Sequence, residues 1–112
     1  MWLYTKDSFL SIVEDKNDSN QLLVRGRING DIEKMFPDST VFKGGGTDYL
    51  YRAFIPREVV SEAIKEQVDN LDYTNFKSAN VEQRQHHLMD IWDIMFHVQQ
   101  DHHSGLPFSY FI

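Results

Sequence analysis

The hydrophobic pattern of the chain changes its period at Pro56. Before this residue, apolar side chains alternate with polar ones in short runs; in one run Leu22 and Val24 share a face while Arg25 and Arg27 share the other. After it, apolar residues recur three or four positions apart. Alternation is typical of a half-buried strand, and the longer period is typical of an amphipathic helix. The first half of the chain therefore predicts a sheet, and the second half predicts helices.

Five strands are predicted, at residues 2–5, 9–14, 21–28, 39–43 and 48–55, with a short helix at 31–36. Longer helices are predicted at 57–71 and 81–100, joined by a loop at 72–80. The strand connections are short, which favours antiparallel pairing. The expected fold class is α+β: an antiparallel sheet of about five strands, in the order β-β-β-α-β-β-α-α, with the helices packed mainly on one face.

We expect residues 1–112 to form a single domain, made of strands in 1–56, a helical layer in 57–103 and an aromatic tail in 104–112 that docks. The three glycines at 44–46 predict a hairpin loop, because no lysine and hydroxyl follow them at the spacing of a phosphate-binding loop. No segment resembles a secretory leader or a membrane span, so we expect a cytoplasmic protein without membrane association.

Composition narrows the function classes. The chain has no cysteine, which excludes disulfides, thiol catalysis and thiolate metal sites. Its formal net charge is −6, which argues against a surface built wholly for nucleic acid. The charge is uneven, with a net charge of −1 in residues 1–56 and −5 in residues 57–112. The predicted sheet is therefore nearly neutral, and the helical layer carries most of the acid.

A basic and aromatic group of residues is the leading candidate binding site. Arginine forks beside aromatic rings can hold a carboxylate, a phosphate or an unstacked base, or can pack against a protein partner. Alternation in residues 48–55 places Arg52 on the face opposite Tyr49 and Tyr51. The alternative to a binding site is that these residues belong to an ordinary exposed sheet face, where arginine pairs with acids on neighbouring strands. The predicted binding residues are Lys6, Arg25, Arg27, Tyr49, Tyr51, Arg52, Tyr73, Asn75 and Lys77.

A second candidate is a row of histidine and aspartate on the last helix, at spacings of three and four. Such a row lies along one helix face and could chelate a divalent ion, or it could form weak surface pairs. Its members are His86, Asp90, Asp93, His97 and Asp101. We predict no metal site and no cofactor. The apolar stripe of the same helix is expected to be buried; it comprises Leu88, Ile91, Trp92, Met95 and Val98. Trp2 and Trp92 are expected in the core, with a partner-binding patch that includes the aromatic tail as the alternative.

Several short motifs occur in an order that resembles a widespread family of small bacterial and phage proteins. They are Met1–Trp2 with Thr5, the run at 22–27, the run at 48–52, the run at 72–77, and Trp92 with Met95. The likeness covers most of the chain, to about Gln99. This resemblance implies one small domain and brings no activity with it.

These observations favour a binding protein over an enzyme. The leading hypothesis is a small protein that acts by occupying a protein partner, as an immunity or phage anti-defence inhibitor does. One alternative is a nucleotide or single-stranded RNA binder that uses the arginine and tyrosine residues. Another is a metal-dependent enzyme that uses the histidine and aspartate row.

Overall fold

The structure, a computed structural model, describes residues 1–44 and 48–104. The chain divides into two compact units, Met1–Tyr73 and Thr74–Ile112. The first contains β1 (Trp2–Tyr4), β2 (Phe9–Asp15), β3 (Asp18–Gly26), α1 (Asp31–Met35), β4 (Phe42–Lys43), β5 (Tyr51–Pro56) and α2 (Arg57–Asp69), and the second contains α3 (Phe76–Ala79) and α4 (Glu82–Ser104). Two of the three predicted loop glycines, Gly45 and Gly46, and the aromatic tail after Ser104 lie outside the described residues. The single domain stays a prediction.

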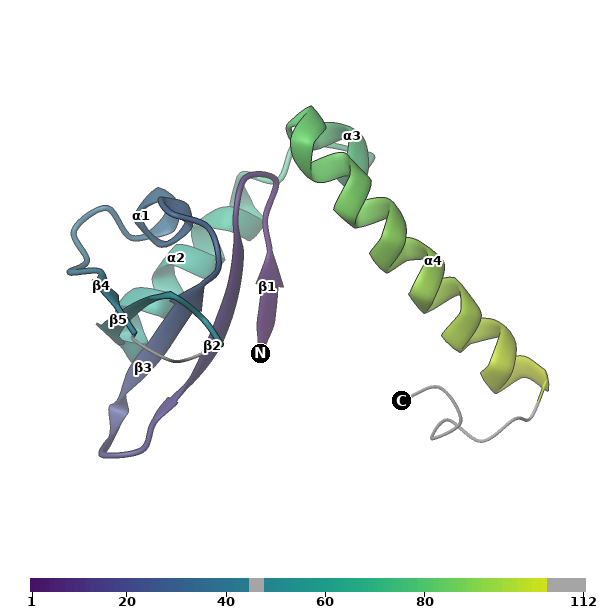
Figure 1. Ribbon diagram of the computed structural model, residues 1–112. Coiled ribbons are helices and arrows are strands. Elements are labelled where there is room, and N and C mark those ends of the chain that lie inside the picture. The colour runs from purple at the N-terminus through teal and green to yellow at the C-terminus, as the bar shows by residue number, and fades with distance from the viewer. Residues whose placement is uncertain (45–47, 105–112) are drawn as a thin grey trace. The chain divides into compact units, whose positions relative to one another are not determined.

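The five strands form one antiparallel sheet in the order β1-β2-β3-β5-β4 (Figure 1). The predicted α+β class is confirmed, and the predicted elements occur in the expected order with one additional short helix, α3. Alternation assigns the faces as expected, because Val24 pairs with Ile12 and Ala53, and all three are buried. Arg25, the next residue, points to the opposite face.

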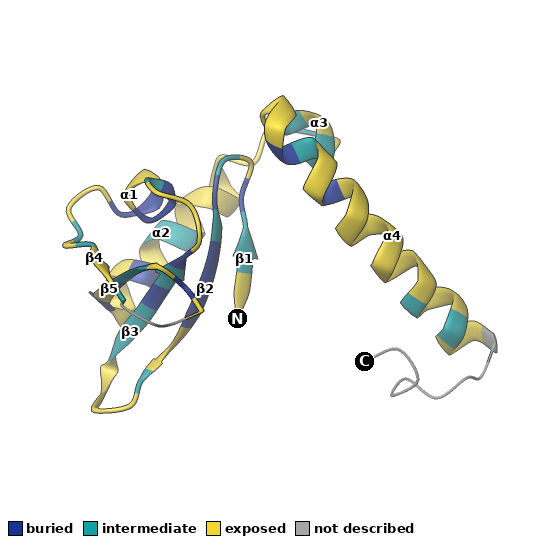
Figure 2. Cartoon of the chain, viewed as in Figure 1, coloured by how far each residue is buried: buried dark blue, intermediate teal, exposed yellow. Residues whose placement is uncertain are grey.

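The core lies between this sheet and helices α1 and α2, which pack on one of its faces. Leu10, Ile12, Val24 and Ile55 contribute from the strands, and Ile32 and Val60 are among the buried residues that the helices bring. Figure 2 shows the buried positions gathered on the central strands and α1. The sheet is therefore apolar toward the helices, and no described helix of this unit covers its other face.

Two side chains, Asp31 of α1 and Arg57 of α2, join the helices to the strands by hydrogen bonds. Gly30 takes the left-handed conformation, with φ of 95°, at the start of α1. The buried carboxylate of Asp31 then accepts a hydrogen bond from the Phe9 backbone N–H at 3.0 Å. At the start of α2, Arg57 donates to Glu14 at 2.6 Å and to the Ser19 carbonyl at 2.9 Å. Both helices are thereby tied to the β2 and β3 region.

Strand boundaries differ from the sequence prediction most at three strands: β4 spans only Phe42–Lys43 where 39–43 was predicted, and β3 and β5 are also shifted. Strand β3 begins at Asp18 rather than at residue 21, because the turn needs only Lys16 and Asn17. Strand β5 begins at Tyr51 rather than at residue 48. Strand β4 pairs only with the first two residues of β5. From Ala53 to Pro56 the outer edge of β5 has no strand beside it in the described part of the chain.

The second unit is a helical pair, and within this unit α3 covers only part of the apolar stripe of α4. The predicted loop at 72–80 contains α3, whose first turn is capped by Asn75 accepting from the Ser78 N–H at 3.0 Å. Leu88 is buried, whereas Ile91, Trp92 and Met95 are 42, 58 and 57% exposed (Figure 2). The pattern identified an apolar face correctly, but α3 is too short to cover it.

None of the described helices is long and apolar enough to span a membrane.

Candidate functional site

A row of five residues crosses the helix-free face of the sheet. The pairing registers place Trp2 opposite Ser11, Ser11 opposite Arg25, Arg25 opposite Arg52, and Arg52 opposite Phe42. Directly paired residues of neighbouring strands point to the same face. The row thus sets two arginines in the middle of the sheet with an aromatic residue at each edge.

Tyr49 organises the arginines of this row. Its ring lies 4.7 Å from the guanidinium carbon of Arg25 and 4.2 Å from that of Arg27. Its backbone carbonyl accepts a hydrogen bond from Nε of Arg52 at 3.2 Å. Tyr49 is only 6% exposed. Each cation–π contact of this kind contributes about 0.5–1 kcal/mol or more, depending on solvent access. Tyr49 therefore holds two arginines through its buried ring and a third through its backbone carbonyl.

Arg25, which is in β3, and Arg27, which is in the loop after β3, have different hydrogen-bond partners. Arg25 donates from Nη2 to the Ser11 hydroxyl at 2.7 Å, while its buried Nε has no partner among the described residues. Arg27 faces Asp48 with both terminal nitrogens, at 3.2 and 3.4 Å. The pKa of Asp48 is lowered, mainly by the hydrogen bond that it accepts from Arg27 and, to a smaller extent, by the positive charge of Arg27. Arg27 is already neutralised by this carboxylate, whereas Arg25 forms no direct ion pair with a described carboxylate and acts on Asp48 only as a weaker, more distant charge.

Aromatic rings surround the arginines on the same face. Phe9 stacks on Tyr4 with ring centroids 4.6 Å apart and meets Trp2 edge-on at 5.6 Å. At the other edge, Phe42 and Phe54 stack at 5.8 Å. Trp2 is 75% exposed and Phe54 is 51% exposed. We name this surface the aromatic-arginine face; it comprises Trp2, Tyr4, Phe9, Leu23, Arg25, Arg27, Phe42, Tyr49, Arg52 and Phe54.

The structure brings together four of the nine predicted binding residues: Arg25, Arg27, Tyr49 and Arg52. The expectation that Tyr49 lies opposite Arg52 is wrong, because the chain is not extended from Asp48 to Leu50, and strand alternation does not apply there. Tyr51, which is in the strand, packs against the core on the helix-covered face and takes no part in the group.

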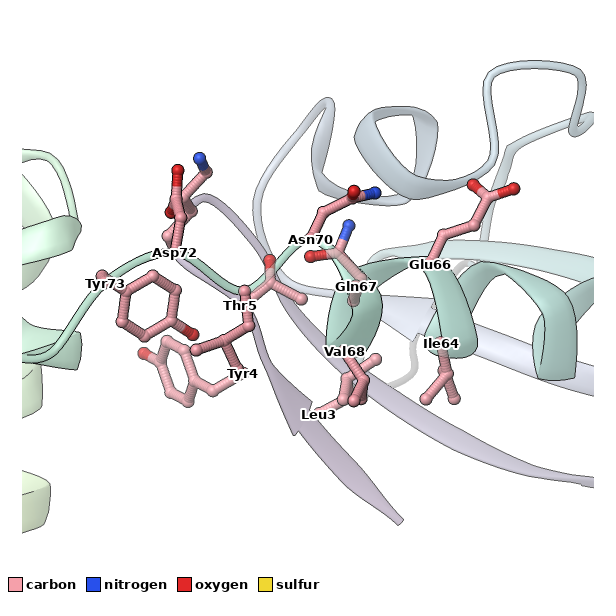
Figure 3. A pocket seen from close by; sticks show the side chains of 12 residues that line it. Leu3, Tyr4, Thr5, Ile64, Glu66, Gln67, Val68, Asn70, Asp72 and Tyr73 are labelled. Atoms are coloured by element: carbon pink, nitrogen blue, oxygen red, sulfur yellow. The ribbon is translucent and has the colours of Figure 1, made fainter.

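The other predicted residues lie elsewhere. Lys6 and Tyr73 line a cleft of about 310 Å³ between the end of β1 and the end of α2, where the rings of Tyr4 and Tyr73 lie close together (Figure 3). Asn75 and Lys77 belong to the Thr74–Ile112 unit. There, Lys77 donates to the Met89 sulfur at 2.8 Å. Lys6 and Tyr73 therefore belong to this cleft and not to the arginine group, and Asn75 and Lys77 are described only within their own unit.

Apart from Tyr49, sequence reasoning missed the aromatic members of the face. Trp2 was expected in the core and is exposed, and so is Trp92 in the other unit. A three-residue strand is too short for alternation to reveal which side is buried. The available signal was the spacing of Phe54 from Arg52, which places both on one face of β5.

Four members of the histidine and aspartate row form two separate, exposed pairs, and Asp101 belongs to neither. Nε2 of His86 lies 3.8 Å from Asp90, and Nδ1 of His97 lies 3.7 Å from Asp93. In residues 1–44 and 48–104, no group of three or more such side chains is arranged to hold a metal ion. These contacts are typical of helix-surface pairs, each contributing a few tenths of a kcal/mol at most.

Comparison of the chain with models of protein families, with curated proteins and with solved structures finds no match. The resemblance to small bacterial and phage proteins therefore stays a prediction.

Proposed function

We propose that this protein is a small non-enzymatic binding protein that acts by occupying a protein partner with its aromatic-arginine face. The observation that carries the proposal is the row from Trp2 to Phe42, with two arginines oriented between exposed rings. Aromatic residues and arginine are the residue types enriched where protein partners bind most tightly. The resemblance to phage proteins favours a bacterial toxin or defence protein as the partner, and hence an inhibitory role.

Preorganisation supports this proposal. Binding costs about 0.5–1.5 kcal/mol for each long side chain that becomes immobilised. Arg25 and Arg52 are already oriented through Tyr49, so part of this cost is met in folding. The terminal nitrogens of Arg52 have no hydrogen-bond partner in the described residues, and a carboxylate of the partner would satisfy them. The face thus suits a partner surface that offers acidic groups within an apolar patch.

Single-stranded RNA is less well supported as the ligand. Phosphate binding requires an excess of free cations, and Arg27 is engaged by Asp48. The Met1–Tyr73 unit has nine Lys and Arg against thirteen Asp and Glu, a net charge of −4. The exposed rings could stack on bases, so the experiment must separate the two ligand classes.

The test is site-specific photocrosslinking in cells of a bacterial host. A crosslinking amino acid at Phe42 or Phe54 should capture the same protein, and one at Glu33, which is exposed on α1, should not. The captured protein should then bind the purified chain, and Phe54→Ala should weaken this binding at least tenfold. Leu71→Ala is the matched control, since Leu71 is 54% exposed but lies off the face.

Two results would contradict the proposal. One is a partner that crosslinks equally from Phe54 and Glu33. The other is binding of a labelled ten-nucleotide RNA that weakens steeply with salt and is abolished by Arg25→Ala with Arg52→Ala, which would favour the nucleic-acid alternative.

A further inference from the structure

A groove runs beside the unpaired edge of β5, away from the aromatic-arginine face except where Phe54 borders both. It has a volume of about 840 Å³ and lies between α2 and the segment that connects α1 to β4. Its lining includes Phe36 from the end of α1 and Val59 and Ala63 from α2. Val59 is 46% exposed. The groove therefore presents apolar surface to solvent in a concave site large enough to enclose several side chains.

Four carboxylates line the same groove: Asp38, Glu58, Glu62 and Glu66. All four are exposed, and none of the other lining residues is a lysine or arginine. No hydrogen bond or ion pair joins any of the four to another described residue. We call this site the acidic groove.

Three of these carboxylates form a column on α2. Glu58, Glu62 and Glu66 are four positions apart, a spacing at which like charges face each other on a helix and destabilise it. Lys65, the one lysine of α2, pairs instead with Asp69 at 2.7 Å. The column is thus an uncompensated electrostatic cost beside an exposed apolar floor. A cationic occupant would remove that cost.

We infer that the acidic groove binds a peptide segment of a partner protein in which lysine or arginine residues flank large apolar side chains. The apolar side chains would cover Val59 and Ala63, and the cations would meet the glutamate column. Charge complementarity determines the class of partner: the aromatic-arginine face suits acidic groups, and the groove suits basic ones. The inference therefore concerns a second surface and does not depend on the proposed function.

The test uses a fluorescein-labelled ten-residue peptide of alternating leucine and arginine as the probe, with fluorescence anisotropy at low salt. Glu58→Gln with Glu62→Gln and Glu66→Gln should weaken its binding about tenfold, the loss expected for three exposed ion pairs. The matched control removes three exposed charges outside the groove, by Glu33→Gln, Glu82→Gln and Asp90→Asn, and should change the affinity less than twofold.

A second pair of variants tests the apolar floor. Val59→Ser should weaken binding at least threefold, whereas Val68→Ser should leave it unchanged, because Val68 is on the same helix but outside the groove. Amide NMR shifts on adding the probe should map to Asp38, Val59 and Ala63. Circular dichroism would verify that every variant is folded.

The inference is overturned by any of three results. The first would be that the wild-type chain fails to bind the probe at low salt. The second would be that both charge-removing triple variants weaken binding equally, which would indicate general attraction to a negative protein. The third would be that the NMR shifts fall outside the groove.

Discussion

Replacing Tyr49 by leucine should destabilise the sheet unit by about 2–3 kcal/mol. An aromatic side chain buries roughly 150–250 Å², which at about 25 cal/mol per Å² gives about 4–6 kcal/mol, against about 1.5–3 kcal/mol for leucine. Because the unfolded chain already buries part of this area, the difference is about 2 kcal/mol. Loss of the two cation–π contacts, with Arg25 at 4.7 Å and Arg27 at 4.2 Å, adds about 1 kcal/mol in total.

Urea denaturation measures this change, provided that the signal reports on the sheet unit alone. A Trp92→Phe background leaves Trp2, which packs against Phe9, as the only tryptophan. Tyr49→Phe in this background should retain the cation–π contacts, so it is the matched control. Arg25→Met completes a double-mutant cycle with Tyr49→Leu, whose expected coupling is about 0.5–1 kcal/mol. A cost of Tyr49→Leu below about 1 kcal/mol, or costs that add without coupling, would refute the role of Tyr49 as the organiser of the face.

Three further predictions concern charge and backbone. Glu62→Gln relieves repulsion from both neighbours in its column, and should raise the free energy of unfolding by about 0.4–1 kcal/mol and the Tm by about 2–6 °C; a lower Tm would contradict this. The pKa of Asp48 is lowered in the folded state, so its contribution to stability is present above its unfolded pKa of about 3.9 and is lost as the pH falls through the folded value. Asp48→Asn should therefore flatten the acid side of the stability profile measured by urea titration, and an unchanged profile would count against the Arg27 pair. Gly30→Ala should cost about 1–2 kcal/mol, because φ is 95° there, although nothing lies within 4 Å of the added methyl group. Gly26→Ala, whose new methyl group would make an ordinary contact with Ile32 at 3.5 Å, should instead change the stability by less than about 1 kcal/mol; thermal melting distinguishes the two.

The sequence predicts the sheet well because alternation directly reflects burial on one face. Leu22 and Val24 are opposed to Arg25, and the structure places them accordingly. The same reasoning fails at Tyr49, which precedes the strand, so its side chain follows the loop rather than the pleat. Period alone cannot locate where a strand begins.

Burial of the helices was predicted less well, for a different reason. An amphipathic pattern shows that a face is apolar but does not show what packs on it. Val60 of α2 is buried against the sheet, whereas Trp92 of α4 is exposed. The candidate site was partly predictable: the arginines are evident in one strand, but Trp2 and Phe42 join them only through pairing registers between segments distant in sequence.

The unpaired edge of β5 has a consequence for solubility. An open strand edge is a template on which a second copy of the same chain can add, which is a common route to aggregation. Here Pro56 lacks a backbone N–H at the end of that edge, and the carboxylates of Glu58 and Glu62 stand beside it. An identical molecule would bring the same negative charges to the contact and be repelled. The acids that suit the groove to a basic segment thus also act as gatekeepers against self-association.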